Sequence, residues 1–298
     1  ATGIGLYRSE FLFFGSALPT RQEQCEAYKH ILNSLAPNPV TIRTLDSGGD
    51  KLVSELSLSD EANPFMGWRS IRVCLDREDL FKDQLKALLQ ANEKGNLRIL
   101  LPMISGLPEL RKSKEHIKTC LAELAEEGIE CPSVEIGIMI EVPAAVMQVE
   151  QLAKEADFFS IGTNDLIQFT LAVDRSNEMI ADMFQPHHPA ILNMIYNTVI
   201  AAHKEGIPVA VCGEMSADPF SILLLIGLGV DELSMTPWSI MEAKKIIRSI
   251  NYEDVNEIAL RTLRFDDAAS VDSFLHQRFA QAFADLGITS YVPAQKIN

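Results

Sequence analysis

The sequence predicts an α/β fold, a (β/α)8 TIM barrel that lacks its first strand, with a C-terminal helical appendage. Short apolar, β-branched runs alternate with segments of helical period, which is the pattern of repeated βα units. Such units also build open doubly wound sheets, but two further observations favour the barrel. Seven strands can be counted, one short of eight, and strand after strand is followed by a polar residue capable of chemistry. In a barrel these positions meet at one mouth, where active sites lie.

The predicted strands are continuous apolar runs rather than alternations of apolar and polar residues. Such runs are typical of parallel strands that are buried on both faces. The predicted strands are Gly3–Tyr7, Val40–Ile42, Arg98–Met103, Glu135–Ile140, Phe158–Ile161, Val209–Val211 and Glu232–Met235. The first of them begins almost at once, without an initiator methionine. Because natural domains seldom begin inside a strand, we expect the chain to be a fragment of a longer polypeptide.

The predicted helices lie between these strands. In Asp76–Asn92 the apolar residues recur at helical spacing, and the segment ends before Gly95. The other helical segments are Leu107–Gly128, Ala144–Glu155, Pro189–Glu205 and Met241–Ile250. We therefore expect residues 1–250 to form the barrel domain. Residues 251–298 contain two amphipathic helical stretches and no convincing strand, which predicts the appendage. The segment Thr44–Trp68 is the longest without a clear pattern, and loops of such length are often functional.

Composition excludes several classes of protein. The 298 residues include 26 Lys and Arg against 41 Asp and Glu, so the net charge is −15. A nucleic-acid-binding protein would usually carry a basic face. The longest apolar patch, Ile222–Val230, is about half the length that spans a bilayer. The five cysteines are scattered and never spaced as CxxC, which favours a reducing compartment over disulfides or zinc. We expect a cytoplasmic globular protein.

Four arginines stand at strand ends or beside glycines: Arg8, Arg43, Arg69 and Arg175. The planar guanidinium group holds phosphate or carboxylate in a bidentate manner and never loses its charge. In an acidic protein, such residues indicate a local anion site. The alternative is that each is a surface arginine that pairs with one of the many acidic residues. This alternative is weakest for Arg8 and Arg43, which end successive strands.

Two carboxylates follow predicted strands, Glu141 and Asp165, and Asn164 precedes the second of them. Hard oxygen ligands from neighbouring strand ends suit Mg²⁺, which takes one or two carboxylates and completes its octahedron with water and substrate oxygens. A carboxylate pair could instead act as general acid and base. With arginines available to hold an anion, metal plus phosphate is the more economical interpretation.

Cys212 ends the apolar run Val209–Val211. Most cysteines in such places are small, inert core residues. At the mouth of a barrel, however, a thiol with an ordinary pKa of about 8.5 can donate a proton at neutral pH. The remaining candidates are weaker. Gly48-Gly49 lacks the spacing of a phosphate loop, and His187-His188 is interpreted as part of a loop.

Six segments together resemble the C-terminal, phosphoenolpyruvate (PEP)-binding domain of the PEP-utilising enzymes. They follow one another in order and without large gaps from about Gly3 to Ile250. The segments are Gly3–Phe13, Asn63–Arg69, Ile140–Pro143, Phe158–Leu166, Leu171–Arg175 and Cys212–Glu214. Within the family, the stretches around Arg175 and Cys212 are most similar to the branch that serves the bacterial sugar phosphotransferase system.

The resemblance implies a (β/α)8 barrel that binds PEP and Mg²⁺. Arg8, Arg43, Arg69 and Arg175 match the family's substrate-binding arginines, and Asn164 and Asp165 match its PEP-contacting pair. Glu141 and Asp165 match its metal ligands, and Cys212 matches its proton donor. The family passes the phosphoryl group to a histidine of a separate N-terminal domain, then to the histidine phosphocarrier protein, and leaves pyruvate. Dimerisation through the barrel is also a family trait, so a homodimer is expected.

The chain departs from the family pattern in two ways. It lacks the glycine-threonine-serine-histidine motif that carries the phosphohistidine, and the family's first barrel strand should precede Gly3. Two other classes of function remain open at this point. One is the barrel of a dikinase or PEP synthase, which an upstream ATP-grasp domain would identify. The other is a non-catalytic PEP-sensing dimerisation module, against which the intact set of candidate residues argues.

Overall fold

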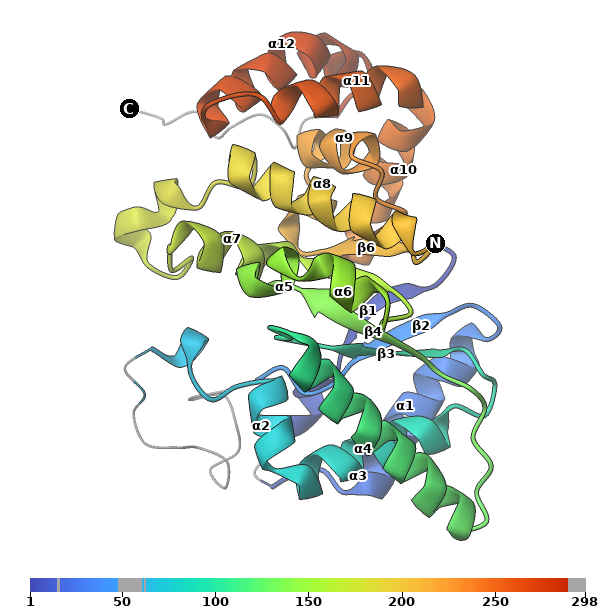
Figure 1. Cartoon of the computed structure of the whole chain (residues 1–298). Coiled ribbons are helices and arrows are strands. Elements are labelled where there is room, and N and C mark those ends of the chain that lie inside the picture. The colour runs from blue at the N-terminus through green and yellow to red at the C-terminus, as the bar shows by residue number, and fades with distance from the viewer. Residues whose placement is uncertain (15–16, 48–60, 62, 289–298) are drawn as a thin grey trace. The chain divides into compact units, whose positions relative to one another are not determined.

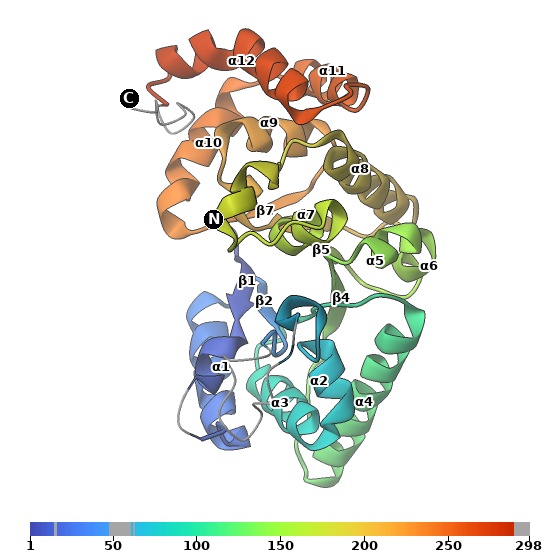
Figure 2. The same cartoon turned by 90° about the vertical axis from the view of Figure 1, so that its left-hand side faces the viewer.

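The computed structural model describes residues 1–14, 17–47, 61 and 63–288. It divides into two compact units. Unit 1 comprises residues 1–140 and 151–160, and unit 2 comprises residues 141–150 and 161–298. The strands follow one another in the sheet in chain order, from β1 to β7. Strand β5 (Phe159–Gly162) and helix α6 (Val149–Ala153) each have residues in both units. Figures 1 and 2 show the elements of each unit.

Unit 1 contains four parallel strands: β1 (Ile4–Arg8), β2 (Val40–Arg43), β3 (Leu97–Leu101) and β4 (Glu135–Ile140). Its helices are α1 (Arg21–Leu35), α2 (Ile71–Asp76), α3 (Glu78–Ala91) and α4 (Leu107–Glu126), with short 3-10 turns η1 (Ser9–Phe13) and η3 (Pro64–Met66). Helices α1, α3 and α4 lie along one side of these strands, and α3 packs between the other two (Figures 1 and 2). All four residues of β2 are buried, as expected for a parallel strand covered on both faces.

Unit 2 contains the parallel pair β6 (Val209–Cys212) and β7 (Glu232–Ser234). Its helices are α5 (Pro143–Met147), α7 (Thr163–Leu171), α8 (Pro189–Lys204), α9 (Pro219–Gly227), α10 (Ile240–Ser249), α11 (Tyr252–Thr262) and α12 (Ala268–Asp285). Its 3-10 turns are η4 (Glu178–Met183), η5 (Glu214–Ser216) and η6 (Pro237–Ser239). Helix α11 packs against α9 at Gly227, where a Cβ would lie 2.3 Å from the Val255 carbonyl oxygen (Figure 1). Only glycine permits this approach of the two helices.

The predicted fold class is confirmed. In the described residues, seven strands alternate with helices in the order of a (β/α)8 barrel, and the C-terminal part is helical. All seven predicted strands form, with ends shifted by at most two residues. The predicted domain boundary at residue 250 stays a prediction. None of the helices in the described part of the chain is both long and apolar enough to cross a bilayer.

Helices differ from the prediction more than strands do. The segment predicted as Asp76–Asn92 begins at Glu78, because Arg77 leaves the helical region and separates α2 from α3. The segment predicted as Ala144–Glu155 is two short helices, α5 and α6, separated at Gln148. Helices α1, α2, α7 and α9 were not predicted. A sequence signal for α1 exists in the capping box, in which Thr20 and Glu23 bond each other's backbone N–H groups.

Candidate active site

The predicted site residues stand at the carboxyl ends of strands. Arg8 and Arg43 are the last residues of β1 and β2, and because these strands are parallel, both lie at the same edge of unit 1. In unit 2, Glu141 follows β4 along the chain, and Cys212 is the last residue of β6. Asn164 and Asp165 belong to the first turn of α7, directly after β5. Arg69 comes just before α2.

Arg43 and Arg69 converge on one carboxylate of unit 1, that of Asp46. The Arg43 Nη1 atom lies 2.6 Å from Asp46 Oδ2, and the Arg69 Nη2 atom lies 3.1 Å from Asp46 Oδ1. All three side chains are about nine-tenths buried. Ser70 also donates its hydroxyl hydrogen to Asp46 Oδ1. Because an isolated buried charge is very costly, the carboxylate allows two guanidinium groups to approach each other away from water.

This arrangement lowers the pKa of Asp46. Burial by itself would raise the pKa, since it penalises the charged form. The positive charges of Arg43 and Arg69, with hydrogen bonds from Ser70 and Arg69, outweigh burial and lower the pKa from 3.8 to about 2. Asp46 is therefore ionised throughout the physiological range and holds both arginines.

A network of hydrogen bonds fixes the end of β2. Glu10 Oε1 lies 2.6 Å from Arg43 Nη2, and the Ser9 hydroxyl donates to the Arg43 carbonyl oxygen at 2.7 Å. Gln84 of α3 donates to the Ser9 hydroxyl at 3.0 Å and accepts from the Leu45 N–H at 2.9 Å. These groups are buried. The Arg43 side chain is thus fixed by two carboxylates and its backbone by a helix packed behind the strand.

Arg8 and Arg175 differ from these two arginines, because both are exposed. Arg175 follows the C-terminus of α7, where Ala172 adopts a left-handed conformation with φ of 54°. Its backbone N–H donates to Gln168 Oε1 at 3.2 Å, which fixes the start of the following segment. Their guanidinium groups can therefore reach a molecule that approaches from solvent.

Glu141 and Asp165 are the predicted metal ligands, and both are buried in unit 2, with 2% and 7% of their surface exposed. In the described residues, no group of three or more His, Cys, Asp and Glu side chains could hold a metal ion. Mg²⁺ does not require such a group, because it takes one or two carboxylates and completes its shell with water and substrate oxygens. Glu141 and Asp165 agree in kind and number with the ligands that Mg²⁺ takes from a protein.

Cys212 ends β6 and begins the short loop Cys212–Glu214, which the N-terminus of α7 holds. The buried thiol is 3.6 Å from the Ile161 carbonyl oxygen, at the end of β5. The Thr163 hydroxyl donates to the Cys212 carbonyl oxygen at 3.1 Å, and the Glu214 N–H donates to Asn164 Oδ1 at 3.3 Å. These bonds bring Cys212 and Asn164 together at one end of β5 and β6, and Asp165 follows Asn164 in the first turn of α7.

Sequence reasoning missed Asp46, Glu10 and Thr163. Each stands within three residues of a residue that was predicted, and this nearness is the signal that could have identified them. The Gly48-Gly49 pair lies outside the described residues. Of the two histidines interpreted as loop residues, His188 caps α8 by accepting from the Ala190 N–H.

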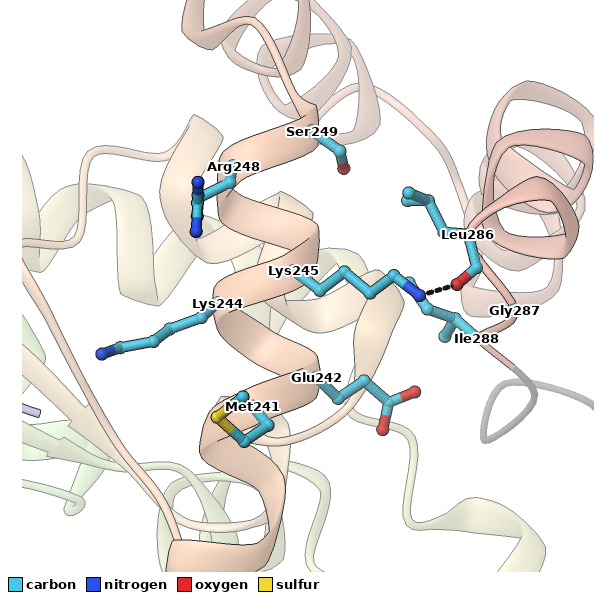
Figure 3. A pocket seen from close by; sticks show the side chains of 9 residues that line it. All are labelled: Met241, Glu242, Lys244, Lys245, Arg248, Ser249, Leu286, Gly287 and Ile288. Carbon is cyan, nitrogen blue, oxygen red and sulfur yellow. Dashed lines mark hydrogen bonds between the residues drawn. The ribbon is translucent and has the colours of Figure 1, made fainter.

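A cavity of about 890 Å³ lies along α10 and the end of α12, apart from the predicted residues (Figure 3). Its lining includes Lys244, Lys245 and Arg248, and Lys245 donates to the Leu286 carbonyl oxygen, which the figure shows as a dashed line. None of the eight predicted site residues lines this cavity. It is therefore not the candidate active site.

In a comparison with known protein families, residues 1–252 match the family described as "PEP-utilising enzyme, PEP-binding domain". The chain is 47% identical over 284 residues to the phosphoenolpyruvate-protein phosphotransferase of Geobacillus stearothermophilus, which covers 95% of this chain and 49% of the relative. It is 45% identical over 279 residues to the protein of the same name from Haemophilus influenzae, with coverage of 93% and 48%. The chain spans about half the length of these curated relatives.

Among solved structures, malate synthase from Haloferax volcanii is similar in fold. The TM-score is 0.52 and the sequence identity 13%, with 91% of this chain and 74% of that chain covered. At this identity the similarity concerns the fold alone.

Proposed function

The chain belongs to the PEP-utilising enzymes, as their PEP-binding domain, and on this premise we propose that it catalyses the PEP-consuming step of a phosphoenolpyruvate-protein phosphotransferase, Enzyme I of the bacterial sugar phosphotransferase system. The phosphoryl group of PEP would pass to a histidine of a separate N-terminal domain and then to the histidine phosphocarrier protein, leaving pyruvate. The names of the curated relatives support this activity over that of a dikinase, a synthase or a sensor.

The observation that carries the proposal is the convergence of Arg43 and Arg69 on Asp46. PEP carries a phosphate and a carboxylate, and guanidinium groups bind both with bidentate geometry. Phosphoryl transfer depends on positioning and on neutralisation of charge more than on covalent chemistry by the protein. Guanidinium groups that buried carboxylates hold in place would supply the positioning, and their N–H groups would bind the anionic oxygens of the substrate. The exposed Arg8 and Arg175 and the amide of Asn164 would complete the contacts to the substrate.

Glu141 and Asp165 would hold Mg²⁺, which neutralises charge on the substrate's oxygens when it is bound. As the bond between phosphorus and the enol oxygen breaks, the phosphoryl group moves to the imidazole nitrogen and the electron pair stays on the enolate of pyruvate. Cys212 would donate its thiol proton to the methylene carbon of the enolate, giving pyruvate and a thiolate that solvent reprotonates. We also propose that the chain acts in the cytoplasm, because its scattered cysteines favour a reducing compartment, and as a homodimer, because dimerisation is a trait of the family.

Calorimetric titration of the chain with PEP and Mg²⁺ tests substrate binding. Arg8→Ala should weaken PEP binding about 10- to 100-fold, which corresponds to the loss of a charge-assisted hydrogen bond. Because Arg8 is exposed, its loss should not affect folding. Arg278→Ala, an exposed arginine of α12, is the matched control and should bind PEP as the wild type does. Equal affinity in the two variants would contradict the assignment of Arg8.

Transfer is tested with labelled PEP, the chain and the carrier protein. The chain alone should leave the carrier unlabelled, because none of its six histidines stands in the acceptor motif. Addition of the N-terminal phosphohistidine domain should give labelled carrier and pyruvate. Label on the carrier without that domain would refute the proposed route.

A further inference from the structure

The peptide that carries Cys212 is held by a different element, the N-terminus of α7. Thr163 is the first residue of this helix and is completely buried. Its hydroxyl donates to the Cys212 carbonyl oxygen at 3.1 Å, across 49 residues of sequence. One residue further along, Asn164 Oδ1 accepts from the Glu214 N–H at 3.3 Å. Two successive side chains of α7 therefore bind the two ends of the Cys212–Glu214 loop.

The residue between these two contacts is glycine, and its geometry explains why the loop needs them. Gly213 has φ of 111°, a conformation that other residues rarely adopt. A Cβ at this position would lie 2.4 Å from Thr163 Oγ1, so the hydroxyl occupies the space that a side chain would fill. Glycine also resists rotation of its backbone less than any other residue. The peptide after Cys212 therefore depends on outside contacts for its orientation.

The position of this peptide affects the position of the thiol. The Cys212 carbonyl carbon and Cβ are both bonded to Cα, so a displacement of the peptide away from Thr163 also shifts the Cα that carries the side chain. In the folded chain, Cys212 Sγ lies 3.6 Å from the Ile161 carbonyl oxygen. The Ser216 hydroxyl donates to the Gly213 carbonyl oxygen at 2.6 Å, but this bond lies within the loop and its following turn. The Thr163 hydroxyl, in contrast, binds the Cys212 peptide directly from α7.

We infer that Thr163 is a positioning residue for the proton donor. Its hydroxyl fixes the Cys212 peptide so that the thiol meets the methylene carbon of the enolate, while PEP and metal are held by other side chains. This inference rests on the proposed function, in which Cys212 donates the proton. Loss of the hydroxyl should therefore slow the formation of pyruvate and leave the affinity for PEP nearly unchanged.

The test compares two substitutions of opposite kind. Thr163→Val keeps the shape of the side chain and removes the donor, whereas Thr163→Ser keeps the donor and removes the methyl group. Pyruvate formation is measured with the phosphohistidine domain added, and PEP affinity is measured by calorimetry with Mg²⁺. Thr163→Val should lower turnover about tenfold, since small misplacements of a reacting group cost one to two orders of magnitude. Its PEP affinity should change less than about twofold, and Thr163→Ser should keep most of the wild-type turnover.

Thr198→Val is the matched control. Thr198 is completely buried, and its hydroxyl donates to the Met194 carbonyl oxygen within α8, outside the Cys212 loop. This variant should have wild-type turnover. Far-UV circular dichroism and urea unfolding of each variant ensure that folded proteins are compared.

The outcomes separate the inference from the function on which it rests. Cys212→Ala, measured in parallel, should bind PEP normally and form pyruvate about 10²–10⁴-fold more slowly, the range for a positioned general acid. If Cys212→Ala is slow but Thr163→Val matches the wild type, the role of Thr163 is refuted and the proposed function stands. If Thr163→Ser is as slow as Thr163→Val, the methyl group and not the hydroxyl positions the loop, which also refutes it. If Cys212→Ala has wild-type turnover, Cys212 is not the proton donor, and the inference about Thr163 is refuted as well.

Discussion

Replacement of Asp46 by asparagine should destabilise the protein substantially at neutral pH. The pKa of Asp46 is lowered from 3.8 to about 2, and each unit corresponds to 1.36 kcal/mol, so its charge contributes about 2 kcal/mol to the folded state. The substitution also removes a buried carboxylate that Arg69 and Arg43 share, whereas the contact between Arg43 and Glu10 stays. Loss of one partner from a buried pair costs up to about 3–5 kcal/mol. Asparagine can still accept a hydrogen bond from Ser70, so we expect a loss of about 2–4 kcal/mol.

The same shift predicts a dependence on pH. The folded carboxyl has the lower pKa, so the unfolded chain binds more protons between about pH 4 and pH 2. The contribution of Asp46 is therefore complete above pH 4 and is lost as the pH falls towards 2. About 1 kcal/mol of it should be gone at pH 3. The gap in unfolding free energy between the wild type and Asp46→Asn should narrow by this amount between pH 7 and pH 3.

Urea unfolding at the two pH values measures both effects. The control is Asp79→Asn, which breaks an exposed pair with Arg77 and should cost less than about 1 kcal/mol. A wild-type unfolding free energy for Asp46→Asn at pH 7, or a loss no larger than that of Asp79→Asn, would refute the argument that burial makes the difference.

Three further predictions follow from single features of the structure. Removal of Mg²⁺ with EDTA should abolish most of the PEP binding that calorimetry detects, because the negative charges of Glu141 and Asp165 would then repel the anionic substrate. Equal affinity with and without EDTA would contradict the metal assignment. His187→Leu should lower the free energy of unfolding in urea by about 1–3 kcal/mol. The reason is that His187 forms hydrogen bonds with Asp272 of α12 at 2.6 Å and with the buried Ser221 of α9 at 2.8 Å. An unchanged free energy of unfolding would show that these bonds to the C-terminal helices do not stabilise the protein. Gly213→Ala should lower the free energy of unfolding by about 1–3 kcal/mol in the same assay, because the φ of 111° is strained for alanine and the new Cβ would contact Thr163. A wild-type free energy of unfolding would show that the loop adapts to the side chain.

The sequence by itself determined the repeat of strands and helices and the residues at the strand ends. These features depend on local pattern. The continuous apolar run of β4 was predicted at its observed bounds, Glu135–Ile140, because a strand buried on both faces has few polar positions. Arg8, Arg43 and Cys212 were predicted to stand at strand ends for the same reason, since each is the polar or reactive residue that ends such a run. The motifs around them also sufficed to indicate the family.

Only the tertiary structure decided which side chains meet. Asp46 follows β2 in a segment without a clear pattern, and nothing in its neighbours shows that its two oxygens face Arg43 and Arg69. Thr163 and Cys212 are 49 residues apart, and their hydrogen bond depends on how the ends of β5 and β6 lie beside each other. The pattern of apolar residues specifies which face of an element is buried. It does not specify partners, because distance between side chains depends on how separate elements pack, and packing is a property of the folded chain.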